Sequence, residues 1–187
     1  MFTLSALRRA SAAVVVLSLA VLLVGCGGGL RVIKPEVDDA AGLRAVSAYH
    51  VAPISYDFDV PAEWDVTEKD WAEKTSDWRR DYSKIIGQAD KPVYVLGPGS
   101  KATDGAIIET SVTQMKVGTY AYFFKSPGHI WGSVTIRDAK SGNVLFKGSF
   151  DSMGRTDDRE VMTFGGRVKL AHEPVAYDLR WLINRRE

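Results

Sequence analysis

The residues able to carry chemistry in this sequence are three histidines, two pairs of aspartates and a single cysteine. His50, His129 and His172 are far apart, and none belongs to a two-histidine metal-binding motif. Each is therefore expected to be a surface or capping residue. We predict no metal site and no other cofactor.

The two acidic pairs are Asp57 with Asp59 and Asp157 with Asp158. Paired carboxylates can perform acid–base catalysis or bind Ca²⁺, but neither pair has the spacing of an EF-hand loop. We expect solvated charges, with Asp57 and Asp59 on one strand face. An envelope hydrolase that uses these carboxylates stays open as an alternative.

Two other catalytic or nucleotide-binding motifs are missing from the sequence. Residues 97–101 read Gly-Pro-Gly-Ser-Lys and lack the Gly-Lys-Ser/Thr order of a phosphate-binding loop, so they indicate a turn. No Gly-x-Ser-x-Gly nucleophile elbow occurs. The sequence therefore favours a protein that is not an enzyme.

The single cysteine follows a short apolar run. Arg8 and Arg9 precede residues 10–25, which carry no charge and end in Leu23-Val24-Gly25-Cys26. A basic start followed by a short apolar region is the layout of a secretory signal, and the run is shorter than the roughly 20 residues that span a bilayer. The pattern resembles the bacterial lipobox.

The lipobox resemblance implies that residues 1–25 are removed and that Cys26 carries a diacylglycerol. The new amino terminus is usually acylated as well, and two or more chains anchor a protein stably where one does not. Gly27 in place of Asp implies sorting to the outer membrane, facing the periplasm. Two alternatives are an uncleaved anchor helix and an ordinary signal cut at a small-x-small site.

Length and composition indicate one extracytoplasmic domain. Removal of the signal from the 187 residues leaves about 162, which suits a single domain. We expect a lipidated cysteine and flexible tether at 26–46 and one domain at 47–187. Net charge is +1, without the basic stripe that nucleic acid requires, and a lone cysteine excludes an internal disulfide.

Hydrophobic periodicity predicts the elements of that domain. A strand is expected at 49–60, and a helix begins at Thr67, capped with Asp70, and ends near Gly87. A buried strand is expected at 92–96 and a longer strand, bent at Gly118, at 106–124. Two strands at 129–138 and 144–150 are joined by a turn at 140–143, and a mobile polar loop follows at 151–160. The last element is a helix from 165 onward, in which Pro174 either causes a kink or occupies the first turn.

This element order predicts an α+β fold. Two helices with apolar stripes and strands joined by tight turns indicate a two-layer sandwich. We expect a mostly antiparallel sheet of about four to five strands with both helices packed on one face.

An aromatic group near the middle of the chain is the candidate interface. Tyr120, Tyr122 and Phe124 alternate onto one face of a predicted strand, and Trp131 follows across a turn. Tyr and Trp are enriched in interface cores. The same pattern also fits an ordinary core beneath a curled sheet, so both interpretations stay open.

Residues 132–148 resemble a strand–turn–strand hairpin of small bacterial lipoproteins, and the layout of the chain is similar to auxiliary lipoproteins of envelope transport systems. The resemblance implies a non-catalytic, membrane-anchored lipoprotein that binds or assembles other envelope proteins. A lipoprotein that binds a small ligand or a lipid is the alternative. The sequence leaves the oligomeric state open.

Overall fold

A β-hairpin with alternating buried and exposed side chains forms the centre of the sheet. In the computed structural model, which describes residues 31–121, 124–156 and 162–185, β8 spans His129–Asp138 and β9 spans Val144–Met153. The Asp138 carboxylate accepts hydrogen bonds from the backbone N–H groups of Lys140 and Ser141 in the turn. The predicted strand–turn–strand is therefore confirmed, with β9 extending into the segment expected to be a loop.

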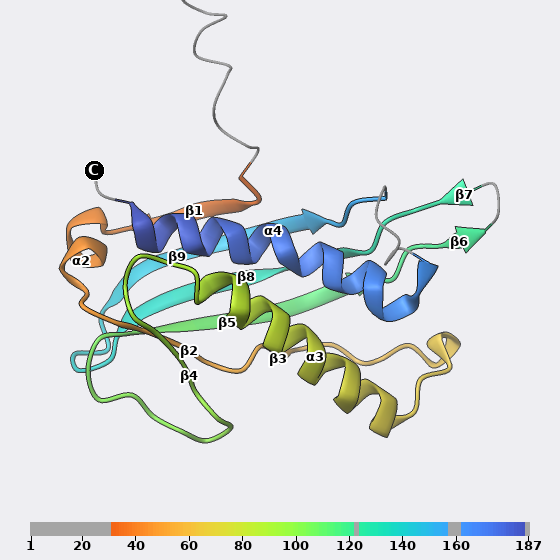
Figure 1. Ribbon diagram of the computed structural model, residues 1–187, viewed down its shortest axis with the longest axis horizontal. Helices are drawn as coiled ribbons and strands as arrows, with labels where there is room; N and C mark the ends of the chain where they lie inside the picture. Colours follow the sequence, from red (N-terminus) through yellow and green to blue (C-terminus); the bar gives the residue numbers. More distant parts are fainter. Residues whose placement is uncertain (1–30, 122–123, 157–161, 186–187) are drawn as a thin grey trace, which may run out of the picture. The chain divides into compact units, whose positions relative to one another are not determined.

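Seven strands form one mixed sheet in the order β1-β9-β8-β5-β2-β4, with β3 also paired to β5 (Figure 1). The added strands are β1 (Ile33–Asp38), β2 (Tyr49–Val51), β3 (Ser55–Tyr56), β4 (Val93–Val95) and β5 (Ala106–Lys116). β1, β9, β8 and β5 pair antiparallel, whereas β2 pairs parallel with both β4 and β5, and β3 pairs parallel with β5.

The expectation of a mostly antiparallel sheet of four or five strands was therefore wrong in both strand number and strand direction. The long helix between β2 and β4 carries the chain back along the sheet, so that β4 can run in the same direction as β2. Parallel strands are usually connected by a crossover helix of this kind. The expected strand at 49–60 is divided into β2 and β3 by residues that include Pro53, because proline has no N–H to donate to a ladder.

Residues 32–46, expected to belong to a flexible tether, instead contain β1 and the short helix α2 (Ala40–Ala45). The Asp39 side chain caps α2 by accepting a hydrogen bond from the Gly42 N–H. Ile33 and Leu43 are buried in the core. The compact unit therefore begins at Val32 and not at residue 47.

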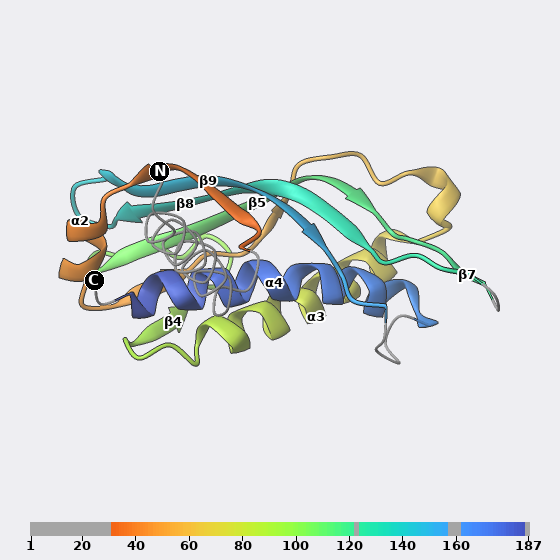
Figure 2. The same cartoon turned by 90° about the horizontal axis from the view of Figure 1, so that it is seen from above.

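Two long helices, α3 (Glu68–Ile86) and α4 (Phe164–Asn184), cover one face of the sheet (Figure 2). The predicted cap of α3 is confirmed, since Thr67 Oγ1 accepts from the Asp70 N–H. Gly87 ends α3, also as predicted. Pro174 lies inside α4, well past its first turn.

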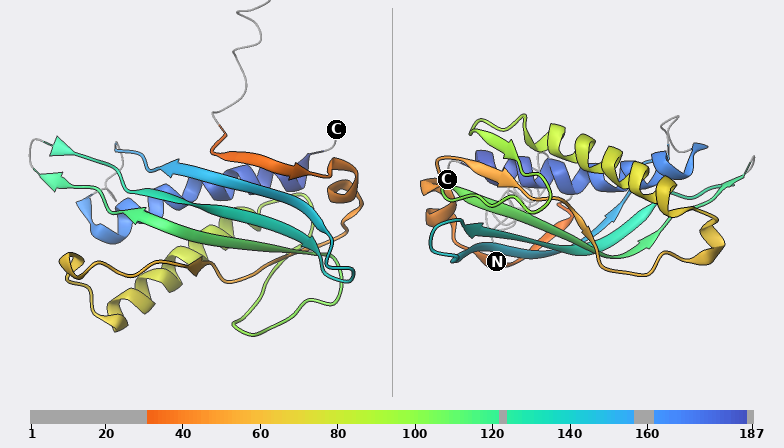
Figure 3. Two further views of the ribbon diagram at one scale, coloured as in Figure 1. Left: turned by 180° about the vertical axis from the view of Figure 1, so that it is seen from behind. Right: turned by 90° about the horizontal axis from the view of Figure 1, so that it is seen from below.

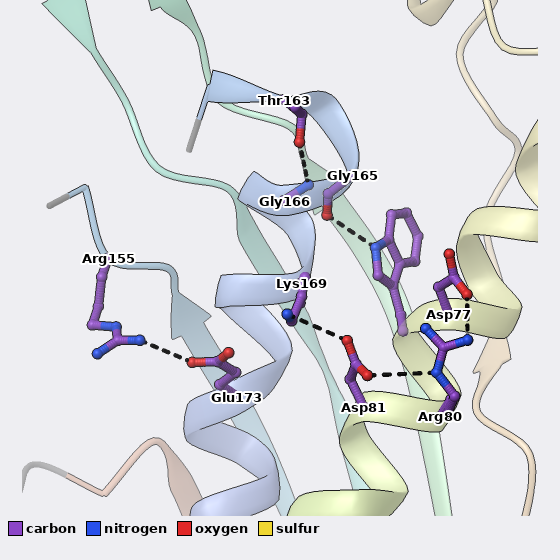
Figure 4. Close-up of polar contacts among 10 residues, drawn as sticks. Asp77, Arg80, Asp81, Arg155, Thr163, Gly165, Gly166, Lys169 and Glu173 are labelled. Atoms are coloured by element: carbon purple, nitrogen blue, oxygen red, sulfur yellow. Dashed lines mark hydrogen bonds and ion pairs between the residues drawn. The ribbon is translucent and has the colours of Figure 1, made fainter. Parts of the chain in front are cut away.

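Polar contacts join the two helices (Figure 4). Lys169 Nζ of α4 lies 3.3 Å from Asp81 Oδ2 of α3, and Thr163 Oγ1 accepts from the Gly166 N–H to cap α4. Trp78 Nε1 of α3 donates to the Gly165 carbonyl at 3.0 Å. The first turn of α4 is therefore held against the middle of α3.

Two further segments differ from expectation. β4 was expected to be buried but is an edge strand, and Tyr94 and Val95 are 55% and 66% exposed.

The expected strand at 106–124 ends at Lys116. After Gly118 (φ +71°) the chain forms β6 (Tyr120–Ala121), which pairs with β7 (Phe124–Lys125) in a separate two-stranded sheet. A β-carbon at residue 118 would lie 2.3 Å from the Pro127 carbonyl oxygen, so glycine is required at this bend.

The 3₁₀ helix η1 (Ala62–Trp64) precedes α3. Within the described ranges, no helix has both the length and the apolar composition that crossing a bilayer requires.

Candidate binding surface

Among the described residues, no helix layer covers the sheet face opposite α3 and α4 (Figure 3). Strand alternation puts Ile130, Val134 and Ile136 of β8 into the core, and therefore puts His129 and Trp131 on this outer face. The structure thus places Trp131 outside the core between the layers, against the interpretation of an ordinary core residue at this position.

Four side chains on β5, β8 and β9 form what we call the outer-face cluster: Lys116, His129, Trp131 and Asp151. The strand register sets Lys116 opposite His129 and Trp131 opposite Asp151. The His129 ring stacks on the Trp131 ring with centroids 3.7 Å apart, and Lys116 Nζ lies 5.6 Å from the Trp131 centroid. His129 Nε2 donates a hydrogen bond to Asp151 Oδ1.

The hydrogen bond from His129 lowers the pKa of Asp151 below its usual value. Asp151 is therefore ionised at neutral pH, and Lys116 Nζ lies over the neighbouring Trp131 ring. The cluster presents one fixed aromatic ring between charges of opposite sign. Such a group is suited to recognition, because an aromatic ring that is already oriented loses little rotamer freedom when a partner covers it.

Polar side chains surround the cluster along the same face. Arg137 pairs with Glu109 and Lys147 with Glu36, each at 3.0 Å. Both pairs are exposed and contribute little to stability. Met153, which pairs with His129 on the same face, is an exposed apolar neighbour of the cluster.

The other predicted interface residues are only partly within the described structure. Tyr120 and Phe124 fall in β6 and β7, and Tyr122 lies outside the described residues. Their common face with Trp131 therefore stays a prediction. Cys26 also lies outside the described residues, so its lipidation stays a prediction.

The sequence analysis missed His129 and Asp151 as members of this surface. His129 was assigned only to the surface or a cap, and Asp151 to a loop. The available signal was the i, i+2 spacing of His129 and Trp131, which puts both on one strand face. Asp151 required knowledge of the β8–β9 register.

The acidic pairs do not form a site in the described structure. Asp57 and Asp59 follow β3 and do not share a strand face, which corrects the expectation. Asp57 Oδ2 accepts hydrogen bonds from Ser55 and Ser111, the latter at 2.6 Å. Asp157 and Asp158 lie outside the described residues.

His172 is buried, which corrects its assignment to the surface. Its Nδ1 donates to the Val168 carbonyl at 2.8 Å, and its Nε2 accepts from the Tyr56 hydroxyl at 3.2 Å. Burial lowers the pKa of His172 to about 4, so the imidazole is neutral at physiological pH. The ring also stacks on Trp78. Within the described residues, no group of three or more His, Cys, Asp or Glu is placed to hold a metal ion.

A pocket of about 350 Å³ lies between α3 and the segments around β3 and β4. Its apolar lining includes Ile54, Val95 and Leu96, and Arg79 and Arg80 of α3 contribute the charged groups. Arg79 Nε and Nη2 donate to the Ile54 carbonyl at 3.2 and 2.8 Å. The pocket therefore offers mostly apolar contact with few free polar groups.

Comparison with known proteins finds similar folds only. No protein-family model matches the sequence, and no curated protein matches it. The PelC dodecamer from Paraburkholderia phytofirmans has a chain that is 10% identical, with a TM-score of 0.48, covering 83% of this chain and 98% of that one. A Xanthomonas campestris protein of the DUF330 family is 12% identical, with a TM-score of 0.47, covering 79% and 86%. Lipoprotein GNA1162 from Neisseria meningitidis is 13% identical, with a TM-score of 0.33, covering 70% and 98%. Such low similarity transfers no residue role to this chain.

Proposed function

We propose that this chain is a non-enzymatic lipoprotein, anchored through Cys26, that binds or assembles other proteins of the bacterial cell envelope. The lipobox at Leu23-Val24-Gly25-Cys26 supports the anchor. The observation that carries the binding role is the outer-face cluster, an oriented tryptophan on the sheet face opposite α3 and α4.

The physical argument for binding rests on Trp131. Apolar surface removed from water contributes about 25 cal/mol per Å², and tryptophan is among the residues that dominate interface energetics. His129 and Asp151 hold the ring in place before any partner arrives. The flanking charges of Lys116 and Asp151 select a partner with complementary charges.

Membrane fractionation of cells that make Cys26→Ser tests the anchor. The variant retains the apolar run at 10–25 but has no thiol to acylate. We expect it to leave the membrane fraction, whereas wild-type protein stays there and floats with outer-membrane markers. A variant that remains in the membrane contradicts the lipid anchor and favours an uncleaved anchor helix.

Site-specific photocrosslinking in intact cells tests the binding surface. A photoreactive residue replaces Ser149, which pairs with Ser133 next to the outer-face cluster. We expect adducts with envelope proteins that weaken strongly when Trp131→Ala is added. The control places the probe at Glu73 on the exposed side of α3. Equal adducts at both positions, or adducts indifferent to Trp131→Ala, would contradict a binding role for this face.

A second candidate function is the binding of a small apolar ligand or lipid in the pocket beside α3. The pocket volume and its lining by Ile54, Val95 and Leu96 favour it. Native mass spectrometry of protein extracted from membranes is expected to show a bound species that Ser83→Trp, in the pocket wall, abolishes. Ser149→Trp on the far face is the control. Unliganded wild-type protein, or retention of the ligand by Ser83→Trp, counts against this function.

A further inference from the structure

The first residues of the folded unit are bound to α4. Asp178 Oδ2 accepts hydrogen bonds from the backbone N–H of Val32 at 2.7 Å and of Ile33 at 3.1 Å. At the other end of β1, Arg185 Nη1 pairs with Asp38 Oδ2 at 2.6 Å. The start of the unit is therefore fixed along the C-terminal half of α4.

Little chain separates this point from the proposed lipid. Val32 is the sixth residue after Cys26. An extended chain spans at most about 3.5 Å per residue, so the connection reaches roughly 21 Å. A domain anchored through Cys26 is thus kept with this part of α4 close to the bilayer surface.

The exposed side of α4 next to Asp178 carries two large aromatic residues. Tyr177 and Trp181 are 47% and 39% exposed and stand at i and i+4, on the side of the helix away from the sheet. Arg180 lies over the Tyr177 ring at 5.2 Å, and Arg185 lies over the Trp181 ring at 5.7 Å. We call these four residues the α4 aromatic face.

Aromatic rings with polar tips, accompanied by arginine, suit the headgroup region of a bilayer. Tyr and Trp are enriched at membrane–water interfaces, and Arg is attracted to anionic lipid. Exposed Tyr and Trp on a soluble helix surface otherwise leave apolar area in water. Because these residues lie on the part of α4 that binds the start of the folded unit, the lipid headgroup layer is the partner that would cover this apolar area.

Resting on the proposed anchor at Cys26, we propose that the α4 aromatic face lies in the headgroup layer of the bilayer that holds the lipid. The helices cover one face of the sheet (Figure 2), and strand alternation places the outer-face cluster on the other face. Contact through α4 therefore turns Trp131 away from the membrane and toward the periplasm. The lipid determines which membrane holds the domain, and α4 determines its orientation there.

Fluorescence quenching by brominated lipid tests this orientation in the full-length, acylated protein. The protein is reconstituted in phosphatidylcholine vesicles that contain brominated phosphatidylcholine, and quenching is compared with plain vesicles. We expect Trp181→Phe to remove most of the tryptophan fluorescence that the brominated lipid quenches. The matched control Trp131→Phe, on the opposite face, is expected to leave that quenched part of the fluorescence unchanged. The proposal is overturned if Trp131→Phe removes the quenching, or if Trp181→Phe leaves the quenching unchanged.

Flotation of the same vesicles separates this inference from the proposed function. Wild-type protein that floats while Trp181 remains unquenched refutes the orientation and leaves the anchor intact. Wild-type protein that does not float, or Cys26→Ser protein that still floats, refutes the lipid anchor, and the orientation derived from it fails as well. Tyr177→Ser is a second variant, expected to reduce the quenching of Trp181 while flotation persists. Unchanged quenching would contradict the proposal that the α4 aromatic face contacts the bilayer.

Discussion

The buried imidazole of His172 accepts a hydrogen bond from the Tyr56 hydroxyl, with Nε2 and Oη 3.2 Å apart. The bond joins α4 to β3 across the layer interface. It requires a neutral ring, because Nδ1 carries the proton that is donated to the Val168 carbonyl. Protonation of Nε2 would remove the acceptor for Tyr56 and place a charge in the core.

This pair predicts that stability depends on pH through His172. The folded pKa of about 4 lies below the unfolded value of 6.5, so the unfolded chain binds the proton more strongly. His172 therefore contributes stability above pH 6.5 that is lost as pH falls toward 4, amounting to about 3 kcal/mol. Urea unfolding at a series of pH values measures it. His172→Gln should show a shallower slope in this window; an unchanged slope would assign the effect to other groups.

Gly132 of β8 should not tolerate a side chain. A β-carbon there would lie 1.9 Å from the Ser111 carbonyl oxygen, a backbone atom of the neighbouring strand. We expect Gly132→Ala to destabilise the protein by about 2 kcal/mol or more, since the strands must separate. Thermal unfolding measures the change.

The matched control for that substitution is Gly165→Ala in the first turn of α4. Nothing lies within 4 Å of a β-carbon at residue 165, and alanine favours helix over glycine by up to about 1 kcal/mol. We expect this variant to be neutral or stabilised. Equal destabilisation by both alanines would mean that strand spacing at Gly132 is not the cause.

Lys91 should matter more than an ordinary surface lysine. Its Nζ donates to the carbonyls of Leu43, Arg44 and Val46 at 3.1, 3.0 and 2.8 Å, which satisfies the end of α2. Lys91→Met is expected to cost about 1–3 kcal/mol, measured by chemical denaturation. The exposed Lys34→Met is the control and should cost far less; similar losses would contradict the capping role.

Asp178 should hold β1 on the sheet edge. Removing its carboxylate leaves the Val32 and Ile33 N–H groups without their acceptor. Asp178→Ala is therefore expected to raise hydrogen exchange of β1 amides and to cost about 1–3 kcal/mol. Asp178→Asn keeps one acceptor oxygen and should have a smaller effect. Unchanged exchange in the alanine variant would show that β1 is held by its pairing with β9 alone.

Sequence patterns predicted the elements whose signal is local. The strand at 129–138 alternates apolar and polar residues, and the helix from Thr67 carries both a cap and an apolar stripe; both were located correctly. The order of these elements also predicted an α+β fold with two helices on one face. The lipobox is likewise a purely local pattern, and its consequences stay predictions.

Other elements had no local signal. β1 buries only Ile33, so its sequence resembles a polar linker, and its strand pairing depends on β9 more than 100 residues later. The outer-face cluster similarly needed the β8–β9 register to bring Asp151 to His129.

The sequence by itself thus determined which segments are amphipathic and where helices begin, and it predicts where a lipid would be attached, because those properties depend on residues a few positions apart. Tertiary structure alone decided which face of the sheet the helices cover and which residues are left outside. His172 is buried and neutral, Val95 is exposed at a strand edge, and Trp181 is partly exposed on the helix that binds the start of the folded unit through Asp178. Whether a residue is buried depends on which distant segments pack against it, and a local sequence pattern does not carry that information.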